Sequence, residues 1–114
     1  MGQCYFVKLR LKYKDESPVI RAANDYISNA SKKCTVFYDG YGFDTVKGIV
    51  KSILAEFQGG FEDKGDGMYE SSFEGRYSWE SVLSEFFMAI KPHLSKGSRI
   101  DVWPDHGHWS EEVT

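Results

Sequence analysis

Four side chains near the end of the sequence are of the types that bind metal ions: Asp101, Asp105, His106 and His108. Imidazole nitrogens and carboxylate oxygens are common ligands of zinc and of other divalent metals. Residues two apart in an extended segment project to the same side, so His106 and His108 would share a face. The cluster predicts a metal-binding domain or a small metal-dependent enzyme. The alternative, favoured by the polar and glycine-containing context, is a group of solvated surface residues.

Other catalytic or cofactor motifs are absent from the sequence. It contains no Gly-x-Ser-x-Gly nucleophile elbow, no Gly-x-Gly-x-x-Gly and no P-loop. Asp63 and Asp66 lie among glycines, but the alternating ligands and the closing glutamate of a calcium loop are missing. We therefore assign no catalytic residue and expect no cofactor other than that metal, which favours a binding protein over an enzyme.

Alternating hydrophobic and polar residues predict the strands that would position these side chains. Residues 4–14 alternate with a period of two, which predicts a strand with one buried face. The same pattern predicts a strand over 61–77, with a hairpin around 64–67 as an alternative, and a short strand over 99–103. The β-prone residues 34–38 predict a weaker strand or an ordered loop.

Apolar residues at helical spacing predict three helices, each opened by an N-cap residue. They run between Ser17 and Ser31, between Asp44 and Gly59, and between Ser78 and Pro92.

The order of these elements, β-α-(β)-α-β-α-β, predicts an α+β two-layer sandwich. Its sheet would be mostly antiparallel, with three to four short strands and three helices, and a ferredoxin-like variant with an added helix is one form of it. The strands of a parallel sheet are apolar on both faces, whereas these alternate. We expect residues 1–114 to form one domain, with a polar tail from about residue 104.

Composition narrows the class of partner. Of the 114 residues, 41% are hydrophobic and 16% aromatic, which is enough for a folded core, and the net charge is −3. An acidic chain disfavours general nucleic-acid binding, which depends on Lys and Arg. No apolar run approaches the ~20 residues of a membrane span, and we find no signal-peptide pattern. With Cys4 and Cys34 far from any metal-finger spacing, we expect a cytoplasmic protein with reduced thiols and no membrane partner.

Polar and aromatic side chains would share the outer face of the predicted sheet. Phe6, Lys8 and Arg10 come from the first strand, Met68 from the strand predicted over 61–77, and Arg99 and Trp103 from the last. Exposed aromatics among charges are typical of protein-binding surfaces. One alternative is a solvated face whose charges pair across the strands. The other is single-stranded nucleic-acid binding, in which Phe6 and Trp103 stack on bases while the cations contact phosphates, although the acidic residues on that face oppose it.

Three segments of the sequence resemble those of known proteins: residues 1–6 (MGQCYF), 73–82 (FEGRYSWESV) and 100–107 (IDVWPDHG). Together they resemble small accessory proteins of unassigned function from phages and mobile elements of Gram-positive bacteria. The resemblance implies a role in binding a protein, for example as an inhibitor of a host defence nuclease complex of the anti-CRISPR type. It transfers no catalytic residue to this chain.

An acidic inhibitor of a nuclease can present carboxylates where its target expects phosphates. In this chain the candidate residues are Glu62, Asp63, Asp66, Glu70 and Glu74. The alternative is an ordinary solvated loop and strand.

Overall fold

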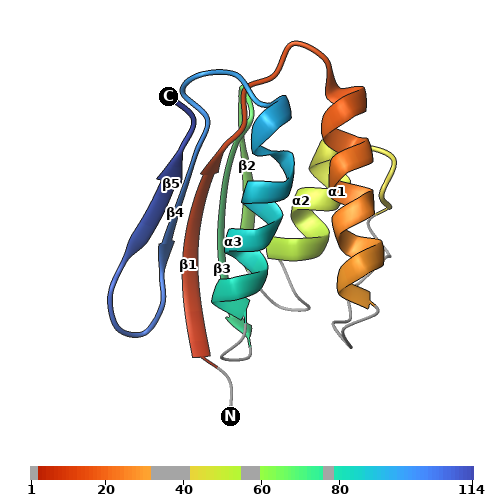
Figure 1. Ribbon diagram of the computed structural model, residues 1–114. Coiled ribbons are helices and arrows are strands. Elements are labelled where there is room, and N and C mark those ends of the chain that lie inside the picture. The colour runs from red at the N-terminus through yellow and green to blue at the C-terminus, as the bar shows by residue number, and fades with distance from the viewer. Residues whose placement is uncertain (1–2, 32–41, 55–59, 76–78) are drawn as a thin grey trace.

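In the described residues, three α-helices cover one face of a five-stranded antiparallel sheet, which confirms the predicted α+β class (Figure 1). The computed structural model describes residues 3–31, 42–54, 60–75 and 79–114. Its elements in chain order are β1 (Gln3–Arg10), α1 (Glu16–Ser31), α2 (Val46–Leu54), β2 (Gly60–Gly65), β3 (Met68–Gly75), α3 (Trp79–Ile90), the 3-10 helix η1 (Lys91–His93), β4 (Arg99–Trp103) and β5 (Trp109–Glu112). The predicted strand at 34–38 and the predicted N-cap Ser78 lie outside the described residues.

The strands are ordered β2-β3-β1-β4-β5, and each neighbouring pair is antiparallel. Without α2 and β5, the order β-α-β-β-α-β is that of a ferredoxin-like domain. The additions are α2, which follows α1 in the first connection, and β5, which pairs with the outer edge of β4. The topology therefore agrees with the predicted ferredoxin-like variant with an added helix.

The fifth strand corrects two predictions, because the described sheet exceeds three to four strands and the segment after residue 104 is not only a polar tail. In β5, Trp109 lies opposite Val102 and Ser110 lies opposite Asp101. A strand of 4 residues ending in two glutamates is too short and too charged to show a clear period. It forms because the edge of β4 offers backbone groups that need partners.

The strand predicted over 4–14 is shorter in the structure, because the backbone leaves the β1 ladder after Arg10. The Leu11 N–H donates instead to the carbonyl of Gly67 at 2.9 Å, in the turn between β2 and β3. The Leu11 side chain remains buried, so the hydrophobic alternation continues past the strand. Periodicity alone therefore overestimated the length of β1.

A tight hairpin joins β2 and β3, so the prediction of one strand over 61–77 is wrong and its alternative, a hairpin around 64–67, is confirmed. Asp66 and Gly67 have φ angles of 53° and 76°. Positive φ at both central residues is what a type I′ turn requires, and Asp-Gly is a preferred pair there. Gly65 also has a positive φ, and the register shifts between Asp63 and Gly65 as a β-bulge.

The N-caps of two helices differ from the predictions by a short shift along the chain. The Asp15 carboxylate accepts a hydrogen bond from the Ser17 N–H at 3.1 Å, so Asp15 caps α1 in place of Ser17. Thr45 caps α2 in place of Asp44, because its hydroxyl accepts from the Gly48 N–H at 3.0 Å. Neighbouring cap-forming residues make this position ambiguous in the sequence.

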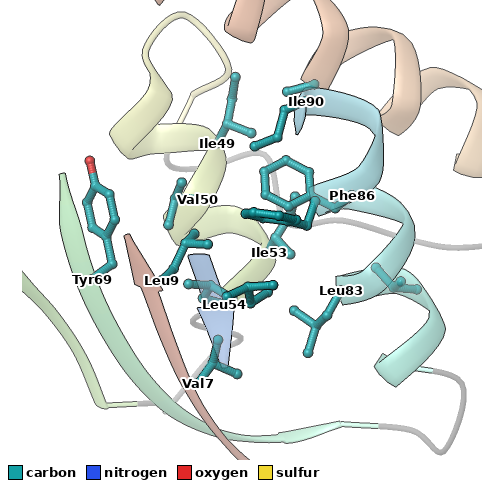
Figure 2. Close-up of a cluster of buried hydrophobic side chains, with 14 of the residues drawn as sticks. Val7, Leu9, Ile49, Val50, Ile53, Leu54, Tyr69, Leu83, Phe86 and Ile90 are labelled. Atoms are coloured by element: carbon teal, nitrogen blue, oxygen red, sulfur yellow. The ribbon is translucent and has the colours of Figure 1, made fainter. Parts of the chain in front are cut away.

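The hydrophobic core lies between the inner face of the sheet and the helices (Figure 2). Buried side chains from β1, β3, α2 and α3 meet there: Val7, Leu9, Ile49, Val50, Ile53, Leu54, Tyr69, Leu83, Phe86 and Ile90. Because all three α-helices lie on this side (Figure 1), the other face of the sheet is left for solvent or a partner.

Candidate functional site

No helix of the described residues covers the sheet face opposite the core (Figure 1). We call the outward-pointing side chains of this face the open face. By strand alternation and register its members are Cys4, Phe6, Lys8, Arg10, Glu62, Met68, Glu70, Ser72, Glu74, Arg99, Asp101, Trp103, Ser110 and Glu112. The binding residues predicted on the first and last strands lie on it together.

An aromatic cluster of Phe6, Trp103 and His108 lies on the open face. Pairing of β1 with β4 places Phe6 opposite Trp103, with ring centroids 5.5 Å apart. The loop after β4 returns His108 onto Trp103, where the rings stack at 4.7 Å with an interplanar angle of 17°. The Lys8 ammonium lies 5.9 Å from the centre of the Trp103 ring, within the range of a cation–π contact.

Asp101 anchors this cluster through two neighbours. The Arg99 guanidinium donates to both of its carboxylate oxygens, at 2.9 and 3.0 Å, and His108 Nε2 lies 3.1 Å from Oδ1. The Arg99 hydrogen bond lowers the pKa of Asp101 below its usual value, partial burial opposes this effect, and the His108 hydrogen bond adds to it. The carboxylate therefore stays ionised and holds His108 beside Trp103.

We expect Asp101→Asn to destabilise the protein at neutral pH and to have little effect in acid. A carboxyl group with a lowered pKa in the folded state stabilises that state above its unfolded pKa of about 3.9. This stabilisation is lost as the pH falls through the lower folded pKa. Urea unfolding between neutral and acidic pH measures the difference. Asp105→Asn, a change at an exposed carboxylate in the following loop, is the control, and an equal, pH-independent effect of both changes would contradict the assignment.

The outward-pointing charges of the neighbouring strands β1 and β3 have opposite signs. The outward charged residues of β1 are Lys8 and Arg10, and those of β3 are Glu70 and Glu74. Lys8 lies directly opposite Glu70 in the register. Neither of these two side chains forms a salt bridge with another described residue. The alternative of a face whose charges pair across strands therefore applies to Arg99 of β4 and Glu112 of β5, whose charged groups lie 3.9 Å apart, but not to Lys8 and Glu70.

The structure divides the predicted acidic surface. Three of its residues lie on the open face: Glu62, Glu70 and Glu74. Asp63 points to the helix side, where its carboxylate lies 3.4 Å from the Lys47 ammonium of α2. Asp66 occupies the hairpin turn. The five carboxylates are therefore not one surface, because adjacent residues of a strand point to opposite faces.

Of the four predicted metal ligands, the structure brings together Asp101 and His108. Both oxygens of Asp101 already accept from Arg99, and Asp105 and His106 are exposed in the loop. Among the described residues, no group of three or more His, Cys, Asp and Glu side chains is placed to hold a metal ion. This geometry gives the metal prediction no support.

Sequence analysis placed Met68 and Arg99 on the outer face without their partners, and it grouped His108 with the metal ligands and missed its contact with Trp103. Arg99 binds Asp101 two residues along the same strand, a spacing visible in the sequence. The Met68 thioether accepts from the Arg10 guanidinium at 3.6 Å, and His108 stacks on Trp103. The last two contacts depend on strand pairing and on the path of the β4–β5 loop, which no local pattern reveals.

Comparisons with protein-family models, with curated proteins and with solved structures find no significant match to the chain. Within the part of the chain that the structure describes, no helix combines the length and apolar character needed to span a bilayer. The open face is therefore interpreted from its own geometry.

Proposed function

We propose that this chain is a cytoplasmic, non-enzymatic protein-binding module that acts through its open face. The observation that supports the proposal is the aromatic cluster on a sheet face that the helices leave uncovered. Tryptophan and arginine are enriched among the residues that dominate protein interfaces. Here Trp103 lies at the end of β4, between Phe6 and His108, with Lys8 of the neighbouring strand close to its ring.

The neighbours of Trp103 pre-organise it for binding. Its ring is only partly exposed and is packed on one side by Phe6 and on the other by His108, which Asp101 holds. A side chain that is already ordered loses less conformational freedom when a partner covers it. The same contacts keep a large aromatic residue partly buried on a solvent-facing strand.

A narrower form of the proposal, an inhibitor of a host defence nuclease complex, depends on the resemblance to accessory proteins of phages. In that form, the carboxylates of Glu62, Glu70 and Glu74 at one side of the open face would take the place of nucleic-acid phosphates. Nucleic-acid binding by Phe6, Trp103 and Lys8 is the competing possibility, and the net charge of −3 disfavours it.

Site-specific photo-crosslinking in bacterial cells tests the proposal. A crosslinking amino acid replaces Ser72, an exposed residue opposite Phe6, and a second chain has it at Met88, which is 48% exposed on α3. We expect crosslinks to protein from position 72 that disappear when Trp103→Ala is added, and not from position 88. Circular dichroism confirms that the altered chains remain folded.

Three outcomes would contradict the proposal. The first is the absence of any protein crosslink from position 72, and the second is a crosslink that persists with Trp103→Ala. The third is a crosslinked species that nuclease treatment removes, which would instead support nucleic-acid binding. For a purified partner, Trp103→Ala should weaken binding by about 30-fold or more, as expected for a tryptophan that dominates an interface.

A further inference from the structure

We infer that the partner of the open face is a second copy of this chain, packed sheet against sheet about a twofold axis. The inference rests on the proposed function, because it takes the same surface and names what covers it. Three features of the open face support it: opposite charges on neighbouring strands, small residues beside large ones, and a register that aligns both.

The geometry follows from the positions of β1 and β3, which are neighbours in the sheet. A twofold axis that lies between the packed faces and runs parallel to the strands, between β1 and β3, places β1 of one copy over β3 of the other. Residues at the same height on the two strands then meet across the interface. Lys8 and Glu70 are at the same height, so Lys8 of each copy meets Glu70 of the other. An isologous dimer has this contact twice.

The row of residues that includes the aromatic cluster is also self-complementary. Gly60, Ser72, Phe6 and Trp103 follow one another across β2, β3, β1 and β4. The two small residues lie on one side of the axis and the two large ones on the other. In the dimer, Phe6 therefore faces Ser72 and Trp103 faces Gly60, where an added Cβ would meet no atom within 4 Å in the single chain.

The arrangement also brings one pair of like charges together. Asp101 and Glu62 come to the same height on opposite copies, but each already binds a cation of its own chain. Asp101 binds Arg99, and Glu62 binds the Lys64 ammonium. Like-charge repulsion at this pair is reduced for that reason.

The size of the face predicts a weak dimer. Four strands about 4.8 Å apart and six residues long give roughly 400 Å² per copy, about half the usual share of a stable interface. We expect a dissociation constant on the order of 10–100 µM, so that the dimer forms at high concentration and a tighter-binding target can displace the second copy.

Charge reversal tests the twofold contact. Sedimentation equilibrium across about 10 µM to 1 mM should show a concentration-dependent dimer. Lys8→Glu alone and Glu70→Lys alone should each weaken it by about tenfold or more, because both symmetric contacts become repulsive. An equimolar mixture of the two variants should restore the wild-type affinity, since each heterodimer again has two opposite-charge contacts. Arg21→Glu, a charge reversal at an exposed residue of α1 on the helix side of the sheet, serves as the control.

Several results would overturn the inference. A chain that stays monomeric at every concentration, a dimer insensitive to both reversals, or variants that fail to complement each other would each do so. If the chain is monomeric but position 72 still gives a Trp103-dependent crosslink to another protein, the homodimer is wrong and the proposed function stands. If neither the dimer nor the crosslink is found, both are wrong.

Discussion

Gly67→Ala should lower the free energy of unfolding by about 3 kcal/mol or more. Gly67 has a φ of 76°, which an alanine adopts only with strain. A Cβ at this position would also lie well inside van der Waals contact of the Leu11 carbonyl oxygen. Since the obstacle is backbone, a side-chain rotation cannot relieve the clash. The turn would have to move and break the hydrogen bond from the Leu11 N–H to the Gly67 carbonyl.

Gly65→Ala is the matched control for this prediction. Gly65 lies in the same hairpin with a φ of 85°, but an added Cβ there meets no atom within 4 Å. It should therefore cost only the strain of a positive φ, about 1–2 kcal/mol. Urea unfolding followed by circular dichroism measures both variants. Equal losses at the two positions would mean that the contact between the hairpin and Leu11 is not what requires glycine at 67.

Phe87→Ala should cost about 3–5 kcal/mol, whereas the adjacent Met88→Ala should cost less than about 0.5 kcal/mol. Phe87 is 0% exposed on the core side of α3, and Met88 is 48% exposed. Removing a buried aromatic ring loses its transfer free energy and leaves a cavity that neighbouring side chains fill only in part. Both changes place alanine in the same helix, so helix propensity contributes little to the difference.

Urea unfolding followed by circular dichroism also measures the free energy of unfolding of Phe87→Ala and Met88→Ala. A loss at Phe87 no greater than that at Met88 would show that α3 does not pack on the sheet as described. Because the open face lies on the other side of the sheet, Met88→Ala should also leave self-association unchanged.

Local patterns predicted the elements of this fold better than their arrangement. The period-two alternation of β1 and the helical spacing of α3 each depend on one buried face, so they are visible in the sequence. The Asp66-Gly67 turn is predictable because few residues tolerate positive φ. The pairing of β1 between β3 and β4 has no such local signal. It depends on contacts between segments that are far apart in the chain.

The candidate site was predicted in part for the same reason. Phe6, Lys8 and Trp103 could be assigned to the outer face from alternation alone, but their contact needed the β1–β4 register. Asp63 was grouped with Glu62 from the sequence, but its side chain lies on the other face of the sheet. Adjacent residues of a strand point to opposite faces. Asp105 and His106 were grouped with Asp101 by proximity in sequence, and the turn after β4 leaves them exposed in the loop.

The central position of β1 also has a consequence for biosynthesis. β1 is made before either of its partners, and it pairs with β3 at residues 68–75 and with β4 at residues 99–103. Contacts of such high sequence separation slow folding, because loop closure costs entropy before native pairing compensates for it. On the ribosome, the edge of β1 that pairs with β4 therefore stays unpaired until β4 has left the exit tunnel. The sheet is completed only after most of the chain has been translated.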